Sequence, residues 1–379
     1  MNPQDSARSV SCLLVSNGYG EDLMGAALAR ALRSRGVEVT AYPLVGMGQA
    51  YAAAGVRTLD PRRNLPTAGF GFRTGIRAAW EDLRAGWIPL TLAQRGTLRA
   101  QRNRHRLVVA VGDVFCLWMA SAAGRTVVYV PTAKSETNDP HRWFELALVR
   151  RMSALSFPRD EVTAERFRRA GLPAEFVGNL MMDCLEFSGE TFHLPQEAPV
   201  VLLLPGSRRD AGDNLARLWA AARQIAARRA DVHFLLAVSP SVQPEELARA
   251  CGAVLDPSWM RDEHLQVQWT RNFADAVARS WVVLGMAGTA HEQAAGLGKP
   301  VVVFPGGGVQ FNRKFLQLQA KLLGEAVVPV SGPQEAARAV LRLLEDPEER
   351  RRRGQAGKHR MGPPGAALRM VDRLLAMAG

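Results

Sequence analysis

The sequence predicts an α/β protein made of two doubly wound, Rossmann-like domains with largely parallel sheets. Short apolar runs rich in valine and leucine alternate with helical segments along most of the chain, as strand and helix repeats of parallel sheets do. At 379 residues the chain is long enough for two domains that each bury a core. Glycine-containing turns follow predicted strands within residues 202–214 and 282–307, where open α/β sheets bind ligands.

The first half of the chain opens with a predicted strand at residues 10–16 and a turn at 17–22. A helix at 23–36, ended by Gly36, and a strand at 37–45 follow. The remaining elements of this half are strands at 107–113 and 126–132, helices near 141–152 and 160–170, the apolar segment 154–158 and a strand at 174–179. This alternation predicts a parallel sheet with helices on both faces.

A domain boundary is expected near residue 190, because residues 186–199 lose their periodicity and gather glycine and proline. We therefore predict an N-terminal domain at 1–190, a C-terminal domain at 191–350 and a C-terminal helix at 351–379 that packs back toward the N-terminal domain. Strands of the second domain are predicted near 200–204, 232–238, 266–269, 281–285, 301–305 and 326–329.

Composition excludes several classes of protein. Hydrophobic residues make up 47% and charged residues 22%, which is typical of a globular chain and not of a disordered one. The apolar stretch 107–123 is shorter than the roughly 20 residues of a bilayer span, and residues 1–9 lack the apolar core of a signal peptide, so we expect a cytoplasmic protein. The four cysteines are scattered and predict no metal site. Despite a net charge of +12, no nucleic-acid-binding motif is present, and nucleic acid is not an expected partner.

Two glycine turns indicate a phosphate-bearing ligand. The turn residues are Gly206, Ser207 and Arg208 in the first, and Gly288, Thr289 and Ala290 in the second. Glycine allows the backbone to approach the ligand, while an arginine pairs with a diphosphate. The unpaired N–H groups and positive dipole of a helix N-terminus also attract phosphate. The alternative for each is an ordinary strand-to-helix turn; together the turns favour a nucleotide diphosphate.

Acidic residues near the ends of two N-terminal strands are candidate general bases. Asp113 ends an otherwise apolar strand, where an unpaired carboxylate would be costly, and Glu21 and Asp22 follow the first strand. The glycines of the same turn would let a substrate approach the backbone. Candidate substrate contacts there are Asn17, Gly18 and Gly20. The alternative for Glu21 and Asp22 is that acidic side chains are favoured in the first turn of a helix.

Three segments carry a family resemblance. In chain order they read FVGNLMMD at 176–183, LLLPGSRRD at 202–210 and AGTAHEQAAGLGKPVVVFP at 287–305. Their order and spacing resemble those of lipid A disaccharide synthase and its relatives, and the N-terminal SNGYGEDLMGAALARALRSRG is similar to that family's opening. The resemblance implies the GT-B glycosyltransferase architecture, in which two Rossmann-like domains face each other across a cleft.

The resemblance also implies a reaction and a set of contacts. It implies an inverting, metal-independent transfer of a hexosamine-type sugar from a UDP donor to a lipid-linked acceptor, without a further cofactor. The family's acidic ribose contact falls on Gln293, with Glu292 one place earlier, and the loop holding Gln310 and Asn312 would face the donor sugar. The alternatives are a first-turn carboxylate for Glu292 and a helix cap for Asn312. A single histidine beside the turn, His291, would contact phosphate or serve only structure.

The segment from Arg62 to Arg106 mixes basic residues with aromatic ones, including Phe70, Phe72 and Trp80. Such a mixture suits an anionic membrane surface, although a pair of amphipathic helices covering the sheet explains it equally. The family's membrane-associating region lies here, so we expect a peripheral protein on the inner face of the cytoplasmic membrane, in cell-envelope lipid biosynthesis. Two alternatives remain: a GT-B-like UDP-sugar hydrolase or 2-epimerase, and a non-catalytic sugar-nucleotide or lipid-binding protein.

Overall fold

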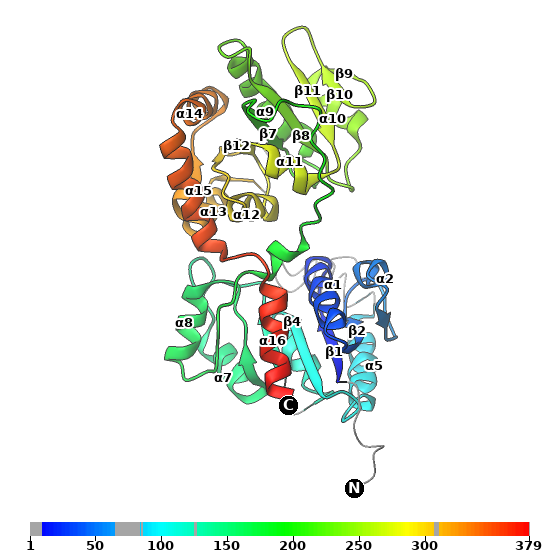
Figure 1. The fold of residues 1–379 in the computed structure, drawn as a ribbon. Helices are drawn as coiled ribbons and strands as arrows, with labels where there is room; N and C mark the ends of the chain where they lie inside the picture. The colour runs from blue at the N-terminus through cyan, green and yellow to red at the C-terminus, as the bar shows by residue number, and fades with distance from the viewer. Residues whose placement is uncertain (1–9, 65–83, 85, 125–126, 307–310, 379) are drawn as a thin grey trace. The chain divides into compact units, whose positions relative to one another are not determined.

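The structure is a computed structural model that describes residues 10–64, 84, 86–124, 127–306 and 311–378. The chain folds into two compact units (Figure 1). The first contains Met1–Cys184 together with Pro364–Gly379, and the second contains Leu185–Pro363. Each unit has its own sheet, so the predicted pair of α/β domains is confirmed.

The first unit is built on a six-stranded parallel sheet in the order β3-β2-β1-β4-β5-β6. Its strands are β1 (Ser11–Ser16), β2 (Glu38–Pro43), β3 (Arg57–Thr58), β4 (Leu107–Gly112), β5 (Val127–Pro131) and β6 (Ser153–Ser156). The central strands β1 and β4 are almost fully buried, as expected for a sheet covered on both faces. Because β1 and β4 are adjacent and parallel, the residues that follow them meet at one edge of the sheet.

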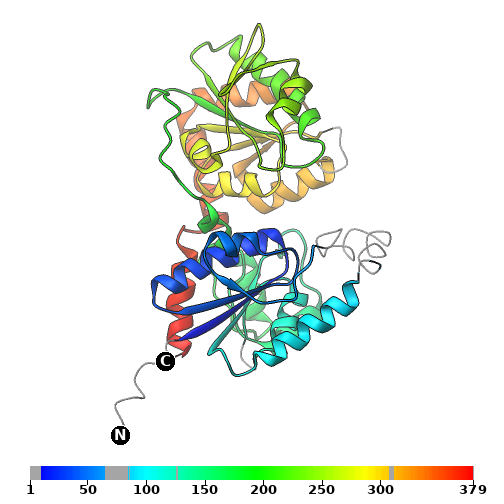
Figure 2. The same ribbon diagram turned by 90° about the vertical axis from the view of Figure 1, so that its right-hand side faces the viewer.

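Helices cover both faces of this sheet (Figure 2). One face packs on α1 (Tyr19–Ser34), α2 (Gln49–Ala53), the 3₁₀ helix η2 (Leu180–Cys184) and α16 (Ala366–Ala378). The other face packs on α5 (Trp87–Ala100), α6 (Val114–Ala120), α7 (Trp143–Met152) and α8 (Glu161–Arg169). Two apolar clusters, one on each face, make this unit a doubly wound layer structure.

The second unit has an eight-stranded sheet in the order β14-β13-β12-β7-β8-β11-β10-β9. Its strands are β7 (Val200–Leu204), β8 (His233–Ala237), β9 (Val254–Leu255), β10 (Trp259–Arg261), β11 (Gln266–Thr270), β12 (Val282–Gly285), β13 (Val301–Val303) and β14 (Val327–Pro329). The six predicted strands all occur and run parallel. The additional strand β10 runs antiparallel to both β9 and β11.

The helices of the second unit follow its strands in the expected alternation. They are α9 (Ala211–Ala226), α10 (Pro244–Cys251), α11 (Phe273–Arg279), α12 (Thr289–Gly296), α13 (Arg313–Leu323), α14 (Pro333–Glu345) and α15 (Pro347–Met361), with the 3₁₀ helix η3 at Gly324–Ala326. Helix α15 approaches α12 closely, since a Cβ on Gly357 would lie 2.3 Å from the Ala295 carbonyl oxygen. The small residue thus lets the two helices touch through their backbones.

The unit boundaries differ from the predicted domains at both ends of the second unit. Residues 185–190 belong to the second unit because the Ser188 and Gly189 N–H groups donate to the Asp275 carboxylate. The predicted C-terminal helix is two helices: α15 stays with the second unit, and α16 returns to the first. The Asp183 carboxylate accepts from the N–H groups of Gly365 and Ala367 and so caps α16 beside α1.

Candidate functional site

Asn17 and Asp113 meet at the edge of the first sheet, where β1 and β4 end. The Asn17 side-chain amide donates to Asp113 Oδ1 at 2.7 Å, and the Cys116 N–H donates to the same oxygen. Asp113 is therefore also the N-cap of α6. Gly112 makes this contact possible, because it has φ 153° and a Cβ there would lie 1.9 Å from Asn17 Oδ1. Two predicted site residues thus form one half-exposed pair.

Helix α1 begins at Tyr19, four residues before the predicted start at residue 23. Glu21 and Asp22 accordingly lie in its first turn, as the electrostatic alternative expected. Gly18 is the N-cap, and its carbonyl accepts from the Asp22 N–H at 2.8 Å. A Cβ on Gly20 would meet nothing within 4 Å, so this part of the turn is open to a ligand.

The two acidic residues of the turn point to different places. Asp22 is 2% exposed and accepts from the Ser16 hydroxyl at 2.6 Å. Burial raises the pKa of Asp22 to about 7, and the Ser16 hydrogen bond opposes that shift. Glu21 instead accepts from the Thr132 hydroxyl at 3.2 Å, at the end of β5. The geometry separates Asp22 from the Asn17–Asp113 pair, whereas the sequence analysis named all three carboxyl groups as candidate bases.

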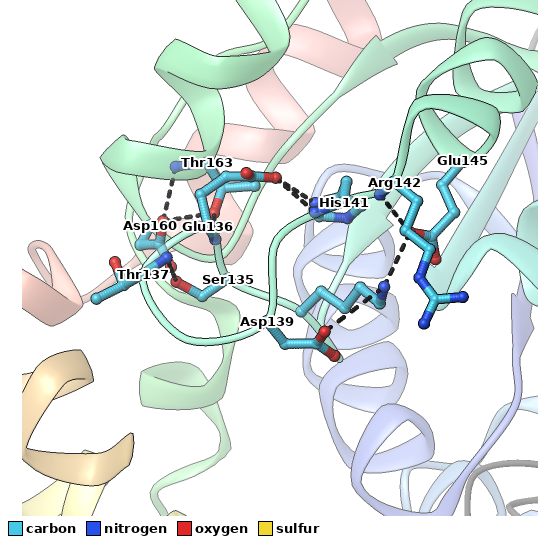
Figure 3. Close-up of polar contacts among 10 residues, drawn as sticks. Ser135, Glu136, Thr137, Asp139, His141, Arg142, Glu145, Asp160 and Thr163 are labelled. Carbon is cyan, nitrogen blue, oxygen red and sulfur yellow. Dashed lines mark hydrogen bonds and ion pairs between the residues drawn. The ribbon is translucent and has the colours of Figure 1, made fainter. Parts of the chain in front are cut away.

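The loop after β5, residues 132–142, is braced by its own polar contacts (Figure 3). His141 Nδ1 donates to Glu136 Oε1 at 2.7 Å, and this pair is buried. Lys134 pairs with Glu145 at 2.8 Å, which contributes to lowering the pKa of that carboxyl against its desolvation. The Glu136 N–H also donates to the Thr163 hydroxyl. Thr132, at the head of this loop, is the contact that connects it to Glu21.

In the second unit the two glycine turns lie side by side, because β7 and β12 are adjacent in the sheet. Gly206 has φ 95°, and a Cβ on it would come within 3.0 Å of the Met286 carbonyl oxygen. A side chain at this position would be strained and crowded, so glycine is needed where the two turns touch. The sequence predicted both turns, and the structure brings them together.

A pocket of about 730 Å³ lies at the first of these turns. Its lining includes Ser207, Arg208, Arg209, Gly212 and residues of the loop after β8 and of α10. The Ser241 hydroxyl donates to the Ser207 carbonyl at 2.9 Å and ties the two walls together. This pocket offers guanidinium groups and the start of α9, a 16-residue helix, to an anion.

Helix α12 begins at Thr289, directly after the second turn, and has no side-chain cap at Gly288. Thr289 is exposed, and Ala290 is half-buried behind it in the first turn. Glu292 and Gln293 are both half-buried one turn further along. The predicted phosphate-facing positions of the turn are therefore at the surface of the unit.

His291 is fully buried and supports the second glycine turn through hydrogen bonds. Its Nε2 accepts from the Ala287 N–H at 3.2 Å, and its Nδ1 donates to Gln319 Oε1 at 2.8 Å. The Gln319 amide in turn donates to the Gly288 carbonyl at 3.0 Å. Burial lowers the pKa of His291 to about 4, so the ring is neutral near pH 7. Of the two alternatives, the structural one holds for this histidine.

Asn312 is the N-cap of α13, because its Oδ1 accepts from the Phe315 N–H at 3.0 Å. The structure therefore confirms the alternative prediction that Asn312 caps a helix. Gln310, the other predicted sugar contact, lies outside the described residues, as do Phe70, Phe72 and Trp80 of the basic aromatic segment.

Arg271 supports the loop that lines the pocket, a role that the sequence analysis missed. It follows β11, and its guanidinium donates to the carbonyl groups of Ser239 and Val242, which shape the loop beside the pocket. The polar run Thr270-Arg271-Asn272 directly after a strand was the available signal. Applying the strand-end argument to this strand as well would have found it.

Aromatic side chains of α5 and α6 form a cluster in the first unit. Phe115 is 5.9 Å from Trp87 and 5.8 Å from Trp118 between ring centroids, and the Arg95 guanidinium lies over the Trp118 ring at 3.9 Å. Ile88 and Leu92 of α5 are exposed. Across the described part of the chain no helix has the length and hydropathy to cross a bilayer, and no cluster of three or more His, Cys, Asp or Glu forms a metal site.

Comparison with solved structures identifies the fold. The UDP-GlcNAc 2-epimerase of Neisseria meningitidis, solved with UDP-GlcNAc, matches 97% of this chain and 100% of its own at 16% identity, with a TM-score of 0.65. The calicheamicin glycosyltransferase CalG4 matches 98% of this chain and 100% of its own at 18% identity, also with a TM-score of 0.65. The chain therefore has the GT-B fold of two Rossmann-like domains.

Sequence comparison finds relatives that are named lipid-A-disaccharide synthase. The lipid-A-disaccharide synthase of Thiobacillus denitrificans is 28% identical over 302 residues, covering 76% of this chain and 75% of the relative. That of Solibacter usitatus is 28% identical over 369 residues, covering 86% and 88%. No family model matches the chain. The chain is thus similar in sequence to lipid-A-disaccharide synthases, which confirms the resemblance carried by its motifs.

Proposed function

We propose that this protein is a UDP-sugar glycosyltransferase that moves a hexosamine-type sugar to a lipid-linked acceptor, in a reaction similar to that of lipid A disaccharide synthase. The observation that carries the proposal is the contact of the two glycine turns on β7 and β12, beside a pocket lined by Arg208 and Arg209. The relatives named lipid-A-disaccharide synthase and the GT-B fold support the same reaction class.

The second unit would hold the donor. Gly206, Ser207 and Arg208 would take the diphosphate together with the N–H groups at Thr289 and Ala290, while Glu292 or Gln293 binds ribose hydroxyls. Two helix N-termini and a guanidinium stabilise the negative charge that develops on the leaving UDP, so the transfer needs no metal ion. Gln310 and Asn312 remain proposed contacts of the donor sugar.

The first unit would supply the base. Asp113 accepts the proton of the acceptor hydroxyl, whose oxygen then bonds to the anomeric carbon while the bond from that carbon to the UDP oxygen breaks. One in-line displacement inverts the anomeric configuration. Asn17 holds the Asp113 carboxylate through its amide at 2.7 Å, and the open position at Gly20, two residues after Gly18, would admit the acceptor.

A lipid-linked acceptor implies work at a membrane surface. Ile88 and Leu92 are exposed on α5, whose Trp87 contacts Phe115 of α6, the helix that Asp113 caps. With a net charge of +12, such a surface suits peripheral binding to anionic lipids on the inner face of the cytoplasmic membrane.

The test of this function is acceptor-dependent release of UDP. UDP-hexosamines, acylated and not, are incubated with the protein and with lipid acceptors in mixed micelles, and UDP is measured. Asp113→Asn should lower turnover by about 10²- to 10⁴-fold, the usual contribution of a general base, and leave UDP binding unchanged. Asp372→Asn, which alters an exposed carboxylate paired with Arg35 in the same unit, is the control and should retain full turnover.

A second candidate is a UDP-sugar 2-epimerase or hydrolase, since fold neighbours from Listeria monocytogenes and Neisseria meningitidis carry the name UDP-N-acetylglucosamine 2-epimerase. This function predicts conversion of the donor without any acceptor. Donor binding with neither conversion nor transfer would instead indicate a non-catalytic sugar-nucleotide-binding protein.

A further inference from the structure

Three carboxyl groups follow β1 and β4 in the first unit, and the proposed transfer uses only Asp113. Glu21 is held by Thr132 at the head of the braced loop. Asp22 is the most deeply buried of the three, and no step assigned so far needs it. A buried carboxyl group is costly unless its surroundings favour its neutral form or pair its charge.

Asp22 ends a chain of hydrogen bonds between buried groups. The Tyr51 hydroxyl donates to Ser16 Oγ at 2.9 Å, and the Ser16 hydroxyl donates to Asp22 Oδ1 at 2.6 Å. Ser16 and Tyr51 are fully buried. Ser16 is also the last residue of β1, directly before Asn17, which holds Asp113. These hydrogen bonds therefore connect Asp22 to the end of β1, which positions Asn17 beside the proposed base Asp113.

Gly25 of α1 leaves the space that the Tyr51 hydroxyl occupies. Tyr51 comes from α2, and its hydroxyl lies so close to α1 that a Cβ on Gly25 would be 1.9 Å from it. A phenylalanine would fill the apolar part of this space, whereas a buried tyrosine hydroxyl requires a partner. Within the part of the chain that the structure describes, this hydroxyl donates to Ser16.

Among the described residues, the titratable groups that interact with Asp22 carry no positive charge. Glu21 on the same helix raises its pKa further, after burial. Tyr51 of α2, Cys116 of α6 and Cys12 of β1 all have pKa values raised by burial and are neutral. Two carboxylates of the elements beside α1 are engaged elsewhere, since Asp183 caps α16 and Asp372 pairs with Arg35 at the far end of α1.

We propose that Asp22 is a positioning residue that acts as a neutral carboxylic acid: through Ser16 it fixes the end of β1 and so holds Asn17 and Asp113 in place. It is not the general base. The kinetic part of this inference rests on the proposed transferase function, and the protonation of Asp22 does not.

The protonation is tested without any assay of turnover. Infrared difference spectra of the full chain should show the C=O band of a protonated carboxylic acid, which disappears as pH rises through about 7 and is absent from Asp22→Asn. Tyr51→Phe should move this titration to higher pH, because losing the donor to Ser16 weakens the bond that favours the ionised form. Tyr42→Phe, which removes a buried hydroxyl bonded to Pro61, should leave it unchanged. No such band in the wild type, or no response to Tyr51→Phe, overturns the inference.

The positioning role is tested by turnover once donor and acceptor are found. Asparagine mimics the neutral acid, so Asp22→Asn should keep kcat within about threefold of wild type, whereas loss of a base would cost about 10²- to 10⁴-fold. Its alkaline limb of kcat against pH should shift upward, because the group that ionises near 7 is gone. A folded Asp22→Asn protein that binds UDP but does not turn over would show that Asp22 is the base. If the wild type transfers no sugar, the infrared result still decides the protonation, and only the proposed function fails.

Discussion

Two glycines determine how closely polar side chains approach at the ends of β1 and β4. Gly112 leaves room for Asn17 beside Asp113, and Gly25 leaves room for Tyr51 beside Ser16. Both contacts join residues far apart in the sequence. The strand-end argument predicted Asn17 and Asp113 as site residues, because it depends only on local sequence and sheet topology. It failed to separate Asp22 from Asp113, because the burial of Asp22 depends on a tyrosine from another helix.

Gly25→Ala should destabilise the first unit by about 1–3 kcal/mol, the usual cost of overpacking, even though alanine is the better helix former by about 1 kcal/mol. The reason is the Tyr51 hydroxyl, 1.9 Å from the new Cβ. Urea unfolding at pH 7 measures the change. Gly20→Ala is the matched control in the same helix, where nothing lies within 4 Å, and it should be neutral or stabilising. Equal effects of the two substitutions would contradict the packing described.

Helices α12 and α13 are joined behind the second glycine turn by His291 and Gln319. The sequence located α12 from its strand, turn and alanine-rich pattern. The role of His291 was open, since a histidine near a phosphate turn serves either ligand or structure until its partners are known. Strands β9 and β10 were missed because two- and three-residue strands carry too little periodicity to detect.

His291→Ala should lower the unfolding free energy by roughly 2–4 kcal/mol at pH 7, through a cavity and two unpaired buried groups. The folded pKa of about 4 lies below the ordinary value of 6.5, so the unfolded chain binds the proton first. The stability due to the neutral ring is therefore present above pH 6.5 and lost as pH falls toward 4. Urea unfolding at pH 7 and pH 4.5 should show the gap to wild type narrowing at the lower pH.

The exposed His264→Ala is the control for this measurement, and it should change the unfolding free energy by less than about 0.5 kcal/mol. A gap between wild type and His291→Ala that stays constant or widens on acidification would show that the ring is not held neutral.

Helix α16 packs into the core of the first unit. Ala366, Met370, Val371 and Leu374 of α16 are at most 1% exposed and join the cluster that contains α1 and β1. The sequence analysis predicted a C-terminal helix packing toward the N-terminal domain, but it could not divide 351–379 into α15 and α16. Gly357 lets α15 pack closely against α12. The sequence alone does not reveal this role, because it depends on the position of the partner helix.

Leu374→Ala should therefore destabilise the first unit by about 2–5 kcal/mol, although it lies five residues from the end of the chain. Hydrogen exchange followed by mass spectrometry should show faster exchange in β1, α1 and β4. Leu368→Ala, at an exposed position of the same helix, should have little effect. Faster exchange confined to the second unit would contradict the assignment of α16.

We propose that the second unit binds a uridine diphosphate at its paired glycine turns. Titration calorimetry with UDP, ADP and GDP tests it most directly, using wild type, Arg208→Ala and Arg229→Ala. The control arginine lies beyond the far end of α9, paired with Asp231, and its loss changes the net charge equally. We expect selective UDP binding that Arg208→Ala weakens by about 1.5–3 kcal/mol, the range for a hydrogen bond to a charged group. Arg229→Ala should leave this binding intact. Equal weakening by both variants, or no binding of UDP by the wild type, would contradict it.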